Sequence, residues 1–258
     1  MSKNFMINRH EDTLAILVKN IGVDLHHHHA VQLVISLDKP YKAVLDNQEF
    51  ESIRGFLIDS DVPHACQSAN ATVLVISVDA TSTKGGLLKQ QLSKNKFLLI
   101  DKVFSVCEID RFSASYWNYC HNATAEFDPL HLICSLYDRQ SNIISFDQRS
   151  LAAIAFINQN IGKTIQVTDI ARHVDLSEGR LRHLFSEQIG IPITSYILWA
   201  RIKVALKEML NPGVTLANAA HRANFSDHAH FTRTFRRMFG ISPSLLLKHS
   251  QFLQVFDL

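Results

Sequence analysis

The spacing of hydrophobic and polar positions changes once along the chain. Up to about residue 80, short β-branched runs alternate with turn-like polar segments, which is typical of a small antiparallel barrel or sandwich. The strands predicted in this way are Val31–Leu37, Tyr41–Leu45, Arg54–Asp59 and Ala71–Asp79. From about Lys84 the apolar positions recur at helical spacing. The pattern therefore predicts an α+β protein with its strands in the N-terminal part.

A polar stretch, Asp138–Ser150, divides the helical part and is the predicted domain boundary. Residues 84–140 before it have helical spacing, beginning with the run Leu87–Ile100. All later segments are also predicted helices: Leu151–Asn160, Thr168–His173, Ser177–Ile189, Thr194–Leu210, Leu216–Arg222 and Asp227–Phe239. We therefore expect a β-barrel in residues 1–83, a helical segment in 84–140 and an all-helical domain in 147–258.

The C-terminal part contains an internal repeat. Ile170–Pro192 aligns with Ala219–Pro243, although the second copy has one extra residue after its serine. Each copy consists of a short helix, a turn and a second helix, which is the plan of a helix-turn-helix motif. The matched positions include Ala171 with Ala220, Phe185 with Phe235, and Gly190–Ile191 with Gly240–Ile241.

The turn of each copy carries residues suited to it. Asp175 and Asn224 stand where the chain commonly needs a positive φ, and Asp and Asn tolerate that conformation best among non-glycine residues. Ser177 and Ser226 follow at the position expected for an N-cap, where a hydroxyl satisfies free backbone N–H groups. Two copies with the same turn chemistry make a chance match difficult to accept.

Each second helix has an apolar stripe opposite a basic face. A solvated cationic surface would explain one such helix, whereas two copies favour a polyanionic partner. Residues 1–146 hold 13 Lys and Arg against 16 Asp and Glu, while residues 147–258 hold 13 against 8. The connector Thr194–Leu210 would form a rod of about 25 Å. A rod of this length suits recognition helices in adjacent major grooves, which lie about 34 Å apart.

Composition restricts the class of protein. With 47% hydrophobic and 19% charged residues, the 258-residue chain is predicted to be globular. No apolar run approaches the roughly 20 residues that cross a bilayer, and the N-terminal stretch lacks the features of a signal peptide. The four cysteines show no C-x-x-C spacing, so we expect a reduced cytoplasmic location and no membrane partner.

The C-terminal part resembles the AraC/XylS family of bacterial transcription regulators. The resemblance covers roughly residues 147–247 and is most specific in "NFSDHAHFTRTFRRMFGISPS", Asn224–Ser244. It implies two helix-turn-helix units in successive major grooves of promoter DNA. The base contacts that it implies belong to Arg182, His183, His228 and Arg233. Gly179 and Ala229 fall at contact positions too, but their side chains cannot hydrogen-bond a base edge.

Three further arginines suit phosphate contacts, which give affinity and salt dependence without sequence information: Arg180, Arg236 and Arg237. The sequence also departs from the family pattern. The family commonly has Gly at the turn where this chain has Asp175 and Asn224. An aromatic–Arg pair often follows its final Pro, whereas "SLLLKHS" follows here.

The N-terminal part resembles a cupin in two stretches, Gly22–Leu37 and Gly55–Ala65. Metal-binding cupins carry His, His, Glu and His at positions that correspond here to His26, His28, Gln32 and His64. Neutral imidazoles suit Zn, Fe or Ni. However, Gln replaces the acidic ligand, and the alternation of a strand would equally allow the other pair of histidines, His27 and His29, to point inward. A metal site, a metal-free effector pocket and purely structural histidines all remain open.

These observations favour a sequence-specific transcription regulator controlled by a small effector or metal. Its expected partners are double-stranded promoter DNA, RNA polymerase, the effector and a second copy of the chain, with residues 84–140 supporting dimerisation. An alternative is a metal-dependent cupin dioxygenase or isomerase with a DNA-binding appendage, which Gln32 argues against. Another is a methyl-accepting repair protein, but no cysteine has the basic or metal-ligand setting that activates a thiolate.

Overall fold

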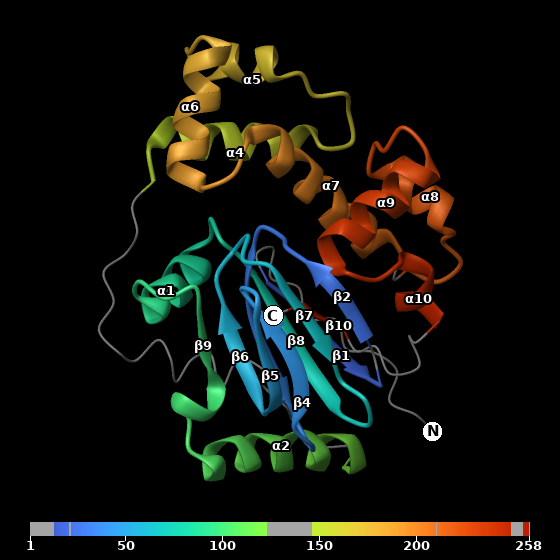
Figure 1. The fold of residues 1–258 in the computed structure, drawn as a ribbon. Coiled ribbons are helices and arrows are strands. Elements are labelled where there is room, and N and C mark those ends of the chain that lie inside the picture. The colour runs from blue at the N-terminus through green and yellow to red at the C-terminus, as the bar shows by residue number, and fades with distance from the viewer. Residues whose placement is uncertain (1–12, 21, 123–145, 210, 249–254, 258) are drawn as a thin grey trace. The chain divides into compact units, whose positions relative to one another are not determined.

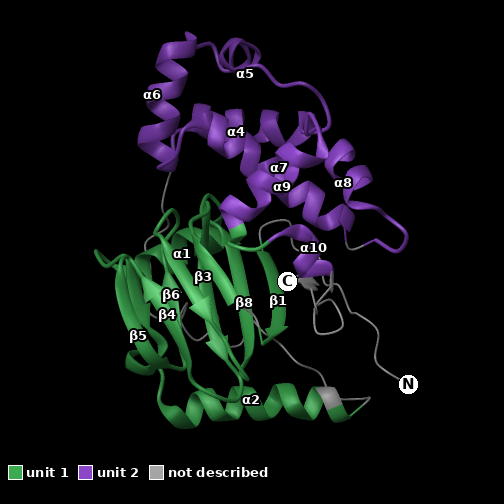
Figure 2. Ribbon diagram, turned by 45° about the vertical axis from the view of Figure 1, so that its right-hand side comes forward, with its two compact units in different colours: residues 1–144, 239–241, 248–258 green, residues 145–238, 242–247 purple. Residues whose placement is uncertain are grey.

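The computed structural model describes residues 13–20, 22–122, 146–209, 211–248 and 255–257. The chain divides into two compact units, shown in two colours in Figure 2. Unit 1 consists of residues 1–144, 239–241 and 248–258, and unit 2 of residues 145–238 and 242–247. The described strands all belong to unit 1, and unit 2 is helical wherever it has regular structure. The α+β fold class is therefore confirmed.

Unit 1 is built on two antiparallel sheets (Figure 1). The six-stranded sheet has the order β10 (Val255–Asp257), β1 (Thr13–Lys19), β8 (Thr72–Asp79), β3 (Ala30–Ser36), β6 (Gly55–Ile58) and β9 (Phe97–Leu99). The four-stranded sheet has the order β2 (Gly22–His26), β7 (His64–Gln67), β4 (Tyr41–Leu45) and β5 (Gln48–Ile53). Four of these strands, β3, β4, β6 and β8, match the predicted ones within two residues. The cupin-like barrel itself stays a prediction.

Strand β3 is buried along its whole length, because both of its faces are covered. Val31, Leu33 and Ile35 point into a hydrophobic core that also holds residues of helices α1 (Thr83–Leu92) and α2 (Val106–His121). A 3₁₀ turn at Ile100–Lys102 leads from β9 toward α2. Since side chains alternate along a strand, Gln32 lies on the opposite face of β3, toward the four-stranded sheet.

One predicted helix is partly wrong. The run Leu87–Ile100 has helical spacing, but α1 ends at Leu92 and the next residues form β9. Strand β9 pairs antiparallel with β6, with Phe56 opposite Leu99. Pairing with the exposed edge of a sheet outweighs the local helical pattern, because it satisfies the backbone groups of β6. The remainder of the predicted helical segment, residues 123–140, lies outside the described residues.

Unit 2 holds the helical repeat. Its helices are α4 (Gln148–Asn160), α5 (Val167–His173), α6 (Glu178–Ile189), α7 (Ile193–Met209), α8 (Leu216–Arg222), α9 (His228–Phe239) and α10 (Pro243–Lys248). Helix α7, at 17 residues, is the predicted connector and is buried along much of its length. Helices α5 and α6 lie toward one end of α7, and α8 and α9 toward the other (Figure 1).

No single helix among the described residues is both long and apolar enough to span a membrane. Helices α6 and α7 reach that length and composition only when taken together, and they are bent by 64° relative to each other.

Candidate functional site

The two helix-turn-helix motifs have the same backbone geometry at their turns. Asp175 has a φ of 53° and Asn224 a φ of 57°, so both lie in the left-handed region as predicted. In each motif the residue after this position donates its N–H to the alanine carbonyl of the first helix. The two distances are 2.9 Å from Leu176 to Ala171 and 3.0 Å from Phe225 to Ala220. The repeat seen in the sequence is thus a repeat in structure.

The two recognition helices, α6 and α9, are capped differently. The Ser177 hydroxyl accepts a hydrogen bond from the Arg180 N–H, which confirms it as the N-cap of α6. Helix α9 begins one residue later than the alignment suggests, so the prediction for Ser226 is wrong. Asp227 takes the capping position, and its carboxylate accepts the His230 N–H at 2.6 Å. The extra residue of the second copy has shifted the cap from the serine to the aspartate.

Both recognition helices bury their apolar stripe and expose their basic face. The buried residues include Leu181, Leu184 and Phe185 on α6, and Phe231, Phe235 and Met238 on α9. The predicted base-contact and phosphate-contact residues are all exposed: Arg180, Arg182, His183, His228, Arg233, Arg236 and Arg237. Their side chains are therefore accessible to a ligand on the surface of the protein.

The two basic faces differ in charge. Helix α6 carries two acidic and two arginine residues, whereas α9 carries three arginines and no acidic residue. On α6 the Arg182 guanidinium bonds Glu178, with Nε at 3.0 Å and Nη2 at 2.6 Å from the same carboxylate oxygen. His183 lies 3.6 Å from Glu187 on the same helix. The second helix-turn-helix therefore presents the stronger positive field.

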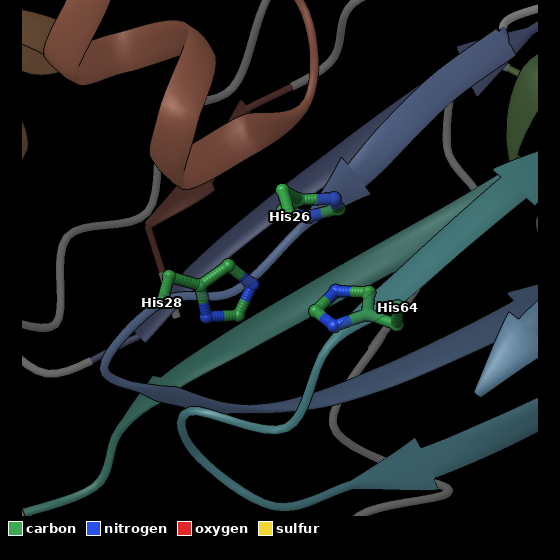
Figure 3. Close-up of side chains that lie close together, drawn as sticks. All are labelled: His26, His28 and His64. Carbon is green, nitrogen blue, oxygen red and sulfur yellow. The ribbon is translucent and has the colours of Figure 1, made fainter. Parts of the chain in front are cut away.

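A cluster of three buried histidines lies between the two sheets of unit 1. Each of His26, His28 and His64 offers one nitrogen, and these three nitrogens lie within 4.8 Å of one another. Figure 3 shows the rings converging from β2, the following loop and β7. His26 and His64 are direct cross-strand partners. Strand alternation thus brought together the histidines that the sequence paired, although His28 lies beyond the end of β2.

The other two histidines of the run point elsewhere. The Nδ1 atom of His27 lies 3.5 Å from an oxygen of Asp61, and that of His29 lies 3.7 Å from the second oxygen. The side chain of His27 is 55% exposed, whereas that of His29 is 2% exposed. Neither belongs to the group that converges with His64.

Hydrogen bonds fix the orientation of the cluster. The Nδ1 atoms of His26 and His64 lie 2.9 Å and 2.8 Å from the backbone carbonyls of Asp24 and Val62. The Nε2 atom of His64 lies 3.1 Å from Oε1 of Gln32. Gln32 in turn donates its amide to the Ser77 hydroxyl at 2.9 Å. Gln32 thereby links β3 of one sheet to β7 of the other.

Burial controls the protonation of the three rings. It lowers the pKa of His26 to about 4 and that of His28 to about 3, and it holds the pKa of His64 well below its usual value. Repulsion between the neighbouring imidazoles lowers these pKa values further. The rings are therefore neutral near pH 7 and keep a lone pair for a ligand.

Three residues of these sites were not found from the sequence. Ser77, on β8, pairs directly with Gln32 on β3 and stands out as a polar position in an apolar strand. Glu178 lies four residues before Arg182, a spacing that favours an ion pair on a helix. Asp227, the cap of α9, was identifiable from the extra residue in the second copy of the repeat.

Comparison with known proteins places these features in context. The family model described as a helix-turn-helix domain matches residues 170–249. The chain is 33% identical over 95 residues to the Msm operon regulatory protein of Streptococcus mutans, covering 37% of this chain and 34% of that protein. It is 30% identical over 106 residues to the transcriptional activator AarP of Providencia stuartii, covering 41% of this chain and 74% of AarP.

The chain spans about a third of the length of the first of these curated relatives. Comparison of structures also shows similarity over nearly the whole chain. An apo variant of ToxT from Vibrio cholerae superposes with a TM-score of 0.64 at 14% identity, covering 94% of this chain and 99% of ToxT. A ToxT structure bound to an unsaturated fatty acid superposes with a TM-score of 0.55, also at 14% identity, over 95% of this chain and 98% of that one. At this identity the likeness shows a shared fold.

Proposed function

Because the chain belongs to the AraC/XylS family of transcription regulators, we propose that it binds promoter DNA in a sequence-specific manner. Helices α6 and α9 would each enter one of two successive major grooves. The observation that carries this proposal is the duplicated motif, with matched turns at Asp175 and Asn224 and an exposed basic face on each second helix. A role at promoter DNA supports a cytoplasmic location, and RNA polymerase is the proposed partner there.

The exposed residues divide by chemistry. Arg182 and Arg233 suit bidentate bonds to guanine O6 and N7, and each good pair contributes about 1–3 kcal/mol of discrimination. His183 and His228 are the other two proposed base contacts. The phosphate contacts are assigned to Arg180, Arg236 and Arg237, which are exposed and lie on the same two helices as the proposed base contacts.

Unit 1 is proposed to sense a small ligand and to hold the dimer together. The sensing part is residues 1–83, and its polar interior is formed by His26, His28, Gln32 and His64. The ToxT structure with a bound unsaturated fatty acid supports ligand sensing in a protein of this fold. Helix α2, in the proposed dimerisation segment 84–140, exposes Val106 and Trp117, and apolar residues of this kind favour a contact between two copies.

An enzymatic role has less support. A metal-dependent cupin dioxygenase or isomerase needs a complete set of ligands and a position for its substrate, and Gln32 stands where the resemblance expects a carboxylate. The curated relatives that match the helical repeat carry names of regulatory proteins.

Selection of bound fragments from random DNA, followed by hydroxyl-radical footprinting of the selected site, tests the proposal. One copy of the protein should protect two patches on one face of the duplex, about 10 base pairs apart. Arg182→Ala should weaken protection of one patch and Arg233→Ala that of the other. Binding without any preferred sequence would contradict the proposal. So would protection of only one patch, with one of the two substitutions having no effect on it.

A further inference from the structure

We propose that His26, His28 and His64 bind one divalent transition-metal ion, with Zn²⁺ as the best fit, and that the Gln32 side-chain oxygen completes the site. The ion would be the effector that unit 1 senses, and this effector role rests on the proposed function. Nothing in the comparisons assigns a metal to this position.

The orientation of the rings favours this proposal. A neutral imidazole has a single N–H, and the carbonyls of Asp24 and Val62 can only accept. His26 and His64 therefore carry their protons on Nδ1 and leave the Nε2 lone pairs for another partner. A ring held by its other nitrogen against a backbone carbonyl is the usual arrangement of a histidine that binds metal. Both carbonyls belong to the residue two positions earlier, so the two strands provide the same arrangement.

The position of Gln32 gives a second reason. Its amide nitrogen donates to Ser77, which turns Oε1 toward Nε2 of His64 at 3.1 Å. If His64 carries its proton on Nδ1, two lone pairs face each other across this distance. A cation between them makes the contact favourable. Two neighbouring ligands of an ion with bond lengths of about 2.1 Å lie about 3.0–3.4 Å apart, and the observed separation falls in this range.

The amide of Gln32 also provides a state without metal. If it rotates by half a turn, its NH₂ group donates to Nε2 of His64, and its oxygen accepts a hydrogen bond from the Ser77 hydroxyl. Gaining or losing the ion would therefore reverse a bond that joins β3 of the six-stranded sheet to β7 of the four-stranded sheet. This reversal is how occupancy would change the contact between the two sheets of unit 1.

The donor set selects the class of ion. Three imidazoles and one amide oxygen in a buried position suit Zn²⁺, Co²⁺ or Ni²⁺. Calcium and magnesium require several oxygen ligands, and the cluster offers one. The three nitrogens lie within 4.8 Å of one another, whereas the ligand atoms of a tetrahedral site are separated by roughly 3.4 Å. Only small shifts are needed to reach this separation, and His28 lies in a loop that can move by that amount.

The test uses the full chain, stripped with a chelator and titrated calorimetrically with Zn²⁺. We expect one ion per chain. His28→Gln and His64→Gln should each weaken Zn²⁺ binding more than about 100-fold, since even residues that only orient a ligand contribute about 10–100-fold. The matched control is His27→Gln, which changes the same residue type in the same run at an exposed position. Equal affinity for Zn²⁺ in the control and the two variants would overturn the proposal.

Two further measurements distinguish the loss of a metal ligand from misfolding of a variant. Gln32→Glu replaces a neutral oxygen by a charged one of the same size and should tighten Zn²⁺ binding at least about 10-fold. Co²⁺ in the wild-type protein should give the intense visible absorption of a tetrahedral ion, and His27→Gln should retain it. Weaker binding by Gln32→Glu, or an octahedral Co²⁺ spectrum that is the same in all variants, would also overturn the proposed ligand set.

DNA binding by the same samples separates this inference from the proposed function. With Zn²⁺ as effector, the affinity for the selected DNA site should change several-fold between stripped and loaded wild-type protein but not in His64→Gln. If one Zn²⁺ bound per chain and the affinity for DNA did not change, the effector role would be refuted, but the metal site itself would still be supported. Zn²⁺ binding in a protein that binds no DNA would instead refute the proposed function.

Discussion

Asp175 and Asn224, 49 positions apart, occupy the same place in two successive helix-turn-helix motifs, with φ values of 53° and 57°. Both residues lie in the left-handed region, where a Cβ atom crowds the following carbonyl. The family commonly places Gly at this position, and the structure shows that the backbone requirement is unchanged here. Asp and Asn meet it because their short polar side chains reduce the cost of this conformation.

Asn224→Val should destabilise unit 2 by about 1–2 kcal/mol, because a β-branched side chain is poorly tolerated at positive φ. Asn224→Gly should leave it as stable or more stable. The chain has two tryptophans, Trp117 in α2 and Trp199 in α7. In a Trp117→Phe background, chemical denaturation followed by fluorescence therefore reports on unit 2 alone.

The control for this prediction is Asn218→Val, the same change at an exposed position within helix α8. Asn and Val have similar helix propensities, so its effect on the midpoint should be small. If Asn218→Val and Asn224→Val lowered the midpoint equally, the cost would not come from the left-handed turn.

The capping residues predict a difference between the two recognition helices. Ser177→Ala should destabilise α6 by about 1 kcal/mol, since the hydroxyl caps a free N–H group. Ser226→Ala should have a smaller effect, because Asp227 caps α9 in its place. Asp227→Ala should therefore lower the thermal midpoint more than Ser226→Ala does. The opposite order would mean that Ser226 caps α9, as Ser177 caps α6.

The cap of α9 should also be sensitive to acid. The hydrogen bond from the His230 N–H is the largest cause that lowers the pKa of Asp227 below its ordinary value of 3.8. A lowered pKa in the folded state stabilises the fold above the ordinary pKa, and this contribution is lost as the pH falls through the lower folded value. The difference in thermal midpoint between wild type and Asp227→Asn should thus be constant near neutral pH and shrink below about pH 4. The difference between wild type and Ser177→Ala, which involves no ionisable cap, should not shrink in the same way.

Local pattern was enough to find the repeat, because its turn residues, apolar stripes and basic faces each follow from spacing within one helix. It was not enough for elements that depend on distant partners. The segment Phe97–Leu99 becomes β9 only because β6 offers an edge to pair with. The polar strand β5 lacks the apolar run by which strands were identified.

The histidine cluster shows the same limit. Alternation proposed His26, His28 and Gln32 as one set, but it could not exclude His27 and His29. The structure selects the first set because His26 is the cross-strand partner of His64. These two histidines lie in the four-stranded sheet, whereas Gln32 lies in the six-stranded sheet. Two sheets that face each other bring these side chains together, and no local period contains that information.

The ion pair on α6 predicts that Glu178 limits DNA binding. Glu178→Gln should release Arg182 and remove a negative charge from the face that is proposed to contact DNA. We expect tighter binding to DNA and a salt dependence steeper by about one unit in the log–log slope. Fluorescence anisotropy titrations at several salt concentrations measure both quantities. Glu187→Gln removes the same charge from the same helix, but Glu187 lies beside His183 rather than Arg182. Its effect should therefore be smaller, and equal effects would show that the Arg182 ion pair is not what limits binding.

Arg233 and Arg237 lie four residues apart on α9 and should affect DNA binding in different ways. Arg233→Ala should cost about 1–3 kcal/mol at the selected site and relax specificity at one base pair, because a bidentate contact to guanine is lost. Arg237→Ala should weaken binding to all sequences and reduce the salt slope by about one, because a phosphate contact is lost. Each variant is titrated against the selected site, against the same site with single base-pair changes, and against unrelated DNA. Arg233→Ala should lose its discrimination at one position while its affinity for unrelated DNA stays close to that of the wild type. If both variants weakened binding to every sequence alike, neither arginine would read a base, and specificity would have to come from Arg182 and the histidines of the two recognition helices.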